Sequence, residues 1–96
     1  MAMDFGLALH ALMRGEAVQR AGWNGKGMFL VYVPGTENCE LRENTPYHAA
    51  LNGEHYTQTH VTISPHIDMF TADGCMQPGW LASQADMLAE DWQIVL

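Results

Sequence analysis

The sequence predicts a small α+β domain, in which an antiparallel β-sheet carries an N-terminal helix and a short C-terminal helix. Two observations predict this class. Apolar residues recur at helical spacing near both ends of the chain, and β-rich segments separated by glycine and proline turns lie between them. The 96 residues suffice for a single domain, residues 1–96, and so small a core favours assembly as a homo-oligomer.

The first helix is expected over residues 4–14. Apolar side chains recur at helical spacing from Phe5 to Leu12, which places them on one face. Asp4 is suited to cap the first turn, and Gly15 is suited to end the helix because glycine adopts positive φ without steric cost.

Two strands are expected next, over residues 16–21 and 28–33. A glycine-flanked turn at residues 22–25 joins them, because Asn-Gly favours tight hairpin turns. The sequence Pro34-Gly35 then ends the second strand.

Residues 36–60 carry the least regular pattern and are expected to form a variable surface excursion. Within it, Thr45 as N-cap and Pro46 at the first helical position predict one helical turn through Leu51, closed by Gly53.

The remaining elements lie between residue 61 and the C-terminus. Strands are expected at 61–63 and 66–71, followed by a turn at 72–74. Ser83 caps the second helix and Asp86, three residues on, completes an acidic capping box. A last strand follows at 91–96, in which Trp92 is expected to be a core residue.

The chain has a formal net charge of -7, from eleven acidic and four basic residues. Binding to a nucleic-acid polymer is therefore not expected, since it requires clustered Lys and Arg. A small anion needs only one or two cations. Cys39 and Cys75 allow one disulfide or two free thiols, and a reducing cytosol favours free thiols. No leader and no membrane span are expected, so a cytoplasmic location is predicted.

No catalytic signature accompanies these features. The five histidines match no metal-binding motif, and neither a nucleophile motif nor a phosphate-binding loop occurs. The acidic residues Asp86, Glu90 and Asp91 are explained by capping and solvation. The sequence therefore predicts a protein that is not an enzyme and needs no cofactor.

Two motifs favour ligand binding instead. They are Arg20-Ala-Gly-Trp-Asn-Gly-Lys26 and Pro78-Gly-Trp-Leu-Ala-Ser-Gln-Ala-Asp86, and each sets an indole, Trp23 or Trp80, beside glycine. Stacking of a nucleobase on an indole contributes roughly 1–3 kcal/mol. Groups suited to base edges or ribose hydroxyls are Asn24, Ser83, Gln84 and Asp86, while Arg20 or Lys26 suits a phosphate.

Two structural alternatives remain open at this point. Trp23 and Trp80 are equally compatible with a role as core aromatics beside turn glycines. If they bind ligand, an oligomer offers one way to unite them, with each motif contributed by a different subunit.

The chain resembles the phage Thoeris anti-defence type 2 family. The resemblance lies in the opening helix, in the segment from Val18 to Pro34, in a Thr-Ala-Asp-Gly turn at 71–74, and in Pro-Gly-Trp-x-x-Ser-Gln-x-Asp-x-x-Ala-x-Asp-Trp at 78–92. Residues 36–60 do not visibly match.

The resemblance implies a phage-encoded sponge in the cytoplasm of the infected bacterial host. Such proteins are homotetramers that bind a cyclic ADP-ribose messenger (gcADPR), made by TIR-domain proteins of the Thoeris defence, and leave it intact. Some relatives also take up cyclic dinucleotides at a separate site. By matching positions, the resemblance implies a ligand site formed by Trp23, Asn24, Trp80, Ser83, Gln84 and Asp86. A hydrolase of the messenger and a module that docks on a host defence protein are the competing hypotheses.

Overall fold

The computed structural model describes residues 2–23 and 27–95. The chain divides into two compact units: the sheet unit, Met1–Val33 with His66–Leu96, and the hairpin unit, Pro34–Pro65. Every strand pairing in the described residues is antiparallel, and helices accompany the strands in both units. The predicted α+β class is thus confirmed.

The first helix, α1, spans Phe5–Met13, one residue shorter at each end than the predicted 4–14, and Asp4 caps it as predicted. The Asp4 side chain accepts a hydrogen bond from the amide of Leu7 at 2.9 Å, which satisfies one of the unpaired donors of the first turn. Gly15 follows the helix with a φ of 92°, a conformation that glycine adopts without the steric cost of a Cβ.

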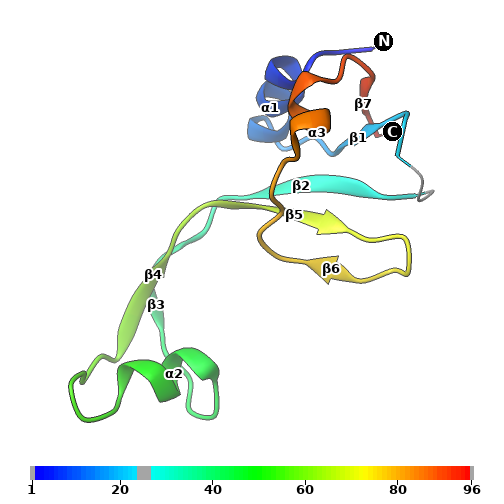
Figure 1. Ribbon diagram of the computed structural model, residues 1–96. Helices are drawn as coiled ribbons and strands as arrows, with labels where there is room; N and C mark the ends of the chain where they lie inside the picture. The colour runs from blue at the N-terminus through cyan, green and yellow to red at the C-terminus, as the bar shows by residue number, and fades with distance from the viewer. Residues whose placement is uncertain (1, 24–26, 96) are drawn as a thin grey trace. The chain divides into compact units, whose positions relative to one another are not determined.

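The sheet unit contains five strands in the order β6-β5-β2-β1-β7 (Figure 1). Consecutive strands in the chain are not always neighbours, because β7 returns to pair with β1, with Val18 opposite Ile94 and Arg20 opposite Trp92. Met3 forms an isolated bridge with Trp92 on the other side of β7. The bounds are β1 Val18–Arg20, β2 Phe29–Val33, β5 His66–Phe70, β6 Met76–Gln77 and β7 Trp92–Ile94.

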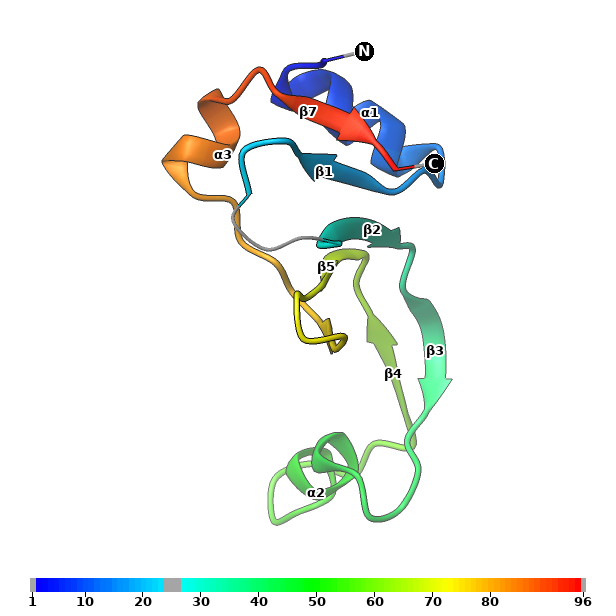
Figure 2. The same cartoon turned by 90° about the vertical axis from the view of Figure 1, so that its right-hand side faces the viewer.

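The core of this unit lies between α1 and the strands β1, β2 and β7, all of which α1 contacts (Figure 2). Its largest fully buried side chains are Trp92, Leu12, Leu30 and Val18. Trp92 is 0% exposed, which confirms the core role predicted for it. Burial of such large apolar side chains stabilises the fold by roughly 1.5–3 kcal/mol each.

The hairpin unit holds two paired strands and a short helix. Strand β3, Thr36–Glu40, pairs with β4, His60–Ile63, with an irregularity in the register between Thr36 and Cys39. Helix α2, Pro46–Leu51, has Thr45 as its N-cap, as predicted, and its C-cap is Asn52 rather than Gly53. The sequence did not predict β3, because four of its five residues are exposed and lack the apolar alternation of a half-buried strand.

Strand β6 was also missed, since it has only two residues, both exposed. The turn before it was predicted: Gly74 has a φ of 85°, and its amide donates to the carbonyl of Thr71. Of the predicted turn at residues 22–25, Gly22 and Trp23 are described, and residues 24–25 lie outside the described residues.

Cys39 and Cys75 are both free thiols, as expected. In the described part of the chain, no helix is both long and apolar enough to span a bilayer. The same residues contain no group of three or more His, Cys, Asp or Glu side chains placed to hold a metal ion.

Candidate ligand-binding site

The two tryptophan motifs meet within the sheet unit. Trp23 follows β1 and Trp80 precedes the last helix, and their ring centroids lie 6.5 Å apart at an interplanar angle of 65°. Both rings pack edge to face on the buried Trp92, with centroid distances of 5.3 Å from Trp23 and 6.2 Å from Trp80. The two motifs therefore meet within one chain. The sequence had left open an oligomer in which each motif comes from a different subunit, and such an arrangement is not needed to bring Trp23 and Trp80 together.

The three indoles differ in exposure. Trp92 is fully buried and belongs to the core. Trp23 and Trp80 are half-buried and pack against the buried core residues. Phe5 of α1 also packs against the cluster, with its ring centroid 5.5 Å from that of Trp92 and 6.4 Å from that of Trp80. The cluster thus combines one fully buried indole, Trp92, with two indoles, Trp23 and Trp80, that keep part of their surface accessible.

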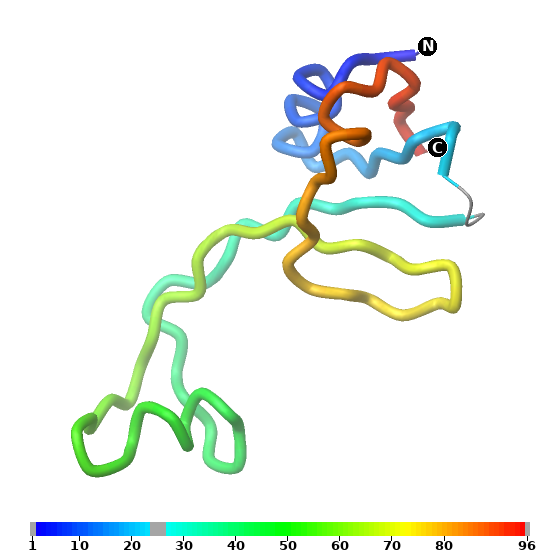
Figure 3. Tube along the Cα trace, viewed as in Figure 1, coloured from blue at the N-terminus to red at the C-terminus, as the bar shows by residue number. Residues whose placement is uncertain are grey.

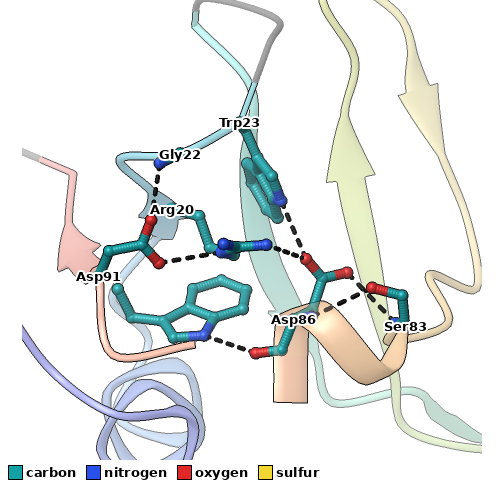
Figure 4. A network of polar contacts seen from close by, with 7 residues as sticks. Arg20, Gly22, Trp23, Ser83, Asp86 and Asp91 are labelled. Atoms are coloured by element: carbon teal, nitrogen blue, oxygen red, sulfur yellow. Dashed lines mark hydrogen bonds and ion pairs between the residues drawn. The ribbon is translucent and has the colours of Figure 1, made fainter. Parts of the chain in front are cut away.

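Asp86 is the polar centre of this region (Figure 4). Its side chain accepts hydrogen bonds from the Arg20 guanidinium at 2.9 Å, the Trp23 indole nitrogen at 3.2 Å and the Ser83 amide at 3.2 Å. Its backbone carbonyl accepts from the indole nitrogen of Trp92 at 2.9 Å. With only 9% of its surface exposed, Asp86 links both motifs to the core.

Asp86 belongs to helix α3, Gln84–Leu88, and completes the predicted capping box with Ser83. The Ser83 hydroxyl accepts from the amide of Asp86 at 3.1 Å, while the Asp86 carboxylate accepts from the amide of Ser83. A five-residue helix is too short to be stable alone, so the cap and the contacts of Asp86 hold it in place.

Arg20 lies between two carboxylates. Its Nη1 donates to Asp86 and its Nε donates to Asp91, each at 2.9 Å. The other oxygen of Asp91 accepts from the amide of Gly22 at 2.7 Å, so Asp91 fixes both the side chain of Arg20 and the backbone just before Trp23 (Figure 4). The side chain of Arg20 is 18% exposed, so solvent screens this pairing less than it screens an ordinary surface ion pair.

These contacts shift the pKa values of the three charged groups. Hydrogen bonds to Asp91 and Asp86 raise the pKa of Arg20 further above its ordinary value. The hydrogen bond from Arg20 is the largest cause of the lowered pKa of Asp91. Burial by itself raises the pKa of Asp86, but the hydrogen bonds that its carboxylate accepts outweigh burial and lower the pKa overall.

The structure joins most of the residues that the sequence singled out. Gln84 is exposed at the first position of α3, and Asn24 and Lys26 lie outside the described residues. The residues brought together in one cluster are Arg20, Trp23, Trp80, Ser83 and Asp86.

The sequence did not find the pairing of Asp91 with Arg20. It predicted Asp86 as a helix cap, a solvated group and a ligand-binding residue, but not as a hydrogen-bond partner of Arg20 and Trp23. Asp86 does cap α3, but it is buried rather than solvated, and Asp91 pairs with Arg20. The structural basis for the Asp91 contact is that Arg20 and Trp92 lie opposite each other in β1 and β7, so the residue before Trp92 lies near Arg20.

Comparisons with known proteins agree with this picture. A family model described as the Tad2-like, or Thoeris anti-defense 2-like, domain matches residues 3–95. A protein named Thoeris anti-defense 2, from Bacillus phage SP01, is 37% identical over 93 residues, which cover 97% of this chain and 94% of the relative. These matches define the class as phage anti-defence proteins. The chain belongs to the Thoeris anti-defense 2-like family, which confirms the resemblance that the two motifs indicated.

Proposed function

We propose that this protein binds and sequesters a cyclic ADP-ribose messenger, gcADPR, made by TIR-domain proteins of the Thoeris system, and that it does not cleave the messenger. The observation that carries the proposal is the pair of half-buried indoles, Trp23 and Trp80, mounted on the buried Trp92. Partly exposed aromatic rings on a rigid base suit the flat adenine of such a ligand.

The polar network supports this proposal through preorganisation. Among the described residues, no buried side-chain nitrogen or oxygen lacks a hydrogen-bond partner. The buried polar groups around the indoles therefore all have hydrogen-bond partners, which helps to hold the indoles in place. A site held in place before binding loses less conformational entropy when the ligand arrives. Stacking of adenine would then contribute roughly 1–3 kcal/mol for each ring engaged.

Polar recognition is assigned to the exposed end of the same region. Ser83 and Gln84 are exposed at the start of α3 and offer a hydroxyl and an amide to ribose, and Asn24 is proposed to act with them. Arg20 remains the proposed phosphate contact. Two of its N–H groups serve Asp86 and Asp91, and the guanidinium has five in all, so further donors remain for an anion.

The ionisation of the carboxylates favours sequestration over hydrolysis. A general acid or base works best when its pKa lies near the working pH. Here the pKa values of both Asp86 and Asp91 are lowered, so they lie further from neutral pH than the ordinary pKa of an aspartate. Their hydrogen bonds to Arg20 instead suit a structural role in holding the site.

The proposal extends to assembly and location. Six large apolar side chains among the described residues of the sheet unit are exposed: Leu81 at 90%, Leu88 at 78%, Met13 at 67%, Leu7 at 51%, Met76 at 50% and Met87 at 40%. Assembly of several copies of the chain would remove these side chains from water, and their exposure therefore supports our proposal of a homotetramer. We place the protein in the cytoplasm of the infected host, with no cofactor, no nucleic-acid polymer and no membrane as partner, and with cyclic dinucleotides as additional ligands at a separate site.

The decisive experiment incubates the protein with gcADPR, removes free ligand and heat-denatures the complex. Recovery of intact messenger is expected, whereas a cleaved product would show a hydrolase. Titration against a panel of cyclic ADP-ribose isomers and cyclic dinucleotides identifies the ligand, and light scattering gives the mass. A host defence protein captured without any messenger would instead support the docking module.

A further inference from the structure

A second buried carboxylate lies outside the Asp86 network. Asp68, in the middle of β5, is 8% exposed. One of its oxygens lies 2.6 Å from Nδ1 of His66 and accepts from the amide of Gly79 at 3.0 Å. An ionised carboxylate only accepts hydrogen bonds, so in this contact the Nδ1–H of His66 is the donor and Asp68 is the acceptor.

These contacts fix the residue just before Trp80. The amide of Trp80 itself donates to the carbonyl of Ile67 at 2.7 Å. Two successive amides, of Gly79 and Trp80, are therefore bound to β5 where the chain leaves β6 and turns toward α3 (Figure 3). Gly79 has a φ of 77°, so the turn adopts a backbone conformation that most residues avoid.

An ionised carboxylate at the buried position of Asp68 requires an explanation, because transfer of a charged group out of water is unfavourable. Burial acts to raise the pKa of Asp68, yet the hydrogen bonds from His66 and Gly79 outweigh it, and the pKa is lowered overall. A charged acceptor makes stronger hydrogen bonds than a neutral one. The arrangement is suited to holding a backbone turn firmly.

We infer that Asp68, oriented by His66, is a positioning residue that holds the Pro78–Trp80 turn and thereby sets the Trp80 indole for ligand stacking. The anchoring of the turn follows from the hydrogen bonds of Gly79 and Trp80 to β5. Its consequence for ligand binding rests on the proposed function. This contact was not predicted from the sequence, since Asp68 and Gly79 are eleven residues apart and meet only in the folded chain.

The test compares Asp68→Ala with Asp68→Asn, which keeps one oxygen acceptor for Gly79. Glu37→Gln, an exposed carboxylate of the hairpin unit, is the control for loss of charge. Amide hydrogen exchange is measured on the ligand-free proteins. In Asp68→Ala, exchange at Gly79 and Trp80 is expected to rise on the order of tenfold or more, as for loss of one charge-assisted hydrogen bond. Asp68→Asn restores part of the protection, and the amides of Met3 and Trp92 stay unchanged in both variants.

Unchanged exchange at Gly79 and Trp80 in Asp68→Ala would overturn the inference, as would an equal rise at Met3 and Trp92, which would indicate global destabilisation. If Asp68→Ala does not fold, Asp68→Asn and His66→Ala decide the matter by the same readout. Messenger affinity is then measured by calorimetry, and Asp68→Ala is expected to weaken it about tenfold, with partial rescue in Asp68→Asn. A wild-type protein that binds no cyclic ADP-ribose refutes the proposed function, whereas the exchange data still decide the anchor.

Discussion

Replacement of Asp86 with alanine removes the carboxylate that joins both tryptophan motifs to the core. The lost bonds are the ion pair with Arg20, at 2.9 Å, and two longer hydrogen bonds donated by Trp23 and Ser83, each at 3.2 Å. Loss of the Arg20 contact costs about 1.5 kcal/mol, the low end for a charged hydrogen bond, because Arg20 keeps Asp91 as a partner. The other two contacts contribute about 1 kcal/mol or less each.

We therefore expect Asp86→Ala to lower the free energy of unfolding by about 3 kcal/mol. For a domain of this size, that loss corresponds to a fall in Tm of roughly 12–24 °C. Total stability for such domains is about 5–15 kcal/mol, so the variant should remain folded at room temperature.

The assay is urea denaturation followed by circular dichroism, on ligand-free protein. Glu90→Ala is the matched control, since it deletes an exposed carboxylate close by in the chain with the same change of charge. Asp86→Asn should fall between Asp86→Ala and wild type, because one side-chain oxygen remains. A loss of less than about 0.5 kcal/mol in Asp86→Ala, no larger than an ordinary surface substitution, would refute the role given to this network.

Three further predictions follow from the same structure. Trp80→Ala should weaken messenger binding roughly 10- to 100-fold in calorimetry, from the lost stacking, and full retained affinity would contradict the site. The pKa values of Asp86 and Asp91 are lowered in the folded state, so their stabilisation is fully present above the ordinary value of 3.8 and is lost as pH falls below it. Denaturation at a series of pH values should show that loss, with a smaller effect in Asp86→Asn. Gly35→Ala should open the β3–β4 pairing, because φ is 86° and the added Cβ would lie 2.3 Å from the carbonyl oxygen of Ile63; faster amide exchange confined to the hairpin unit is the expected result.

The local features of this fold were predictable because they depend on neighbouring residues. Asp4 and Gly15 bound α1, Thr45 begins α2, and Ser83 with Asp86 caps α3, each through contacts within a few positions along the chain. Strand β3 was not predicted because four of its five residues are exposed and show no apolar alternation, and because its partners in β4 are twenty or more positions away in the chain.

The sequence by itself determined the α+β class, the helix ends and the two tryptophan motifs, since capping, glycine conformation and apolar spacing are local properties. Only the tertiary structure decided that Trp23 and Trp80 share one cluster in a single chain, and that Asp91 and Asp68 hold the backbone beside them. The physical reason is that an ion pair or a packed ring selects its partner by distance in space. Arg20 and Asp91 are 71 residues apart, and they meet because β7 pairs with β1.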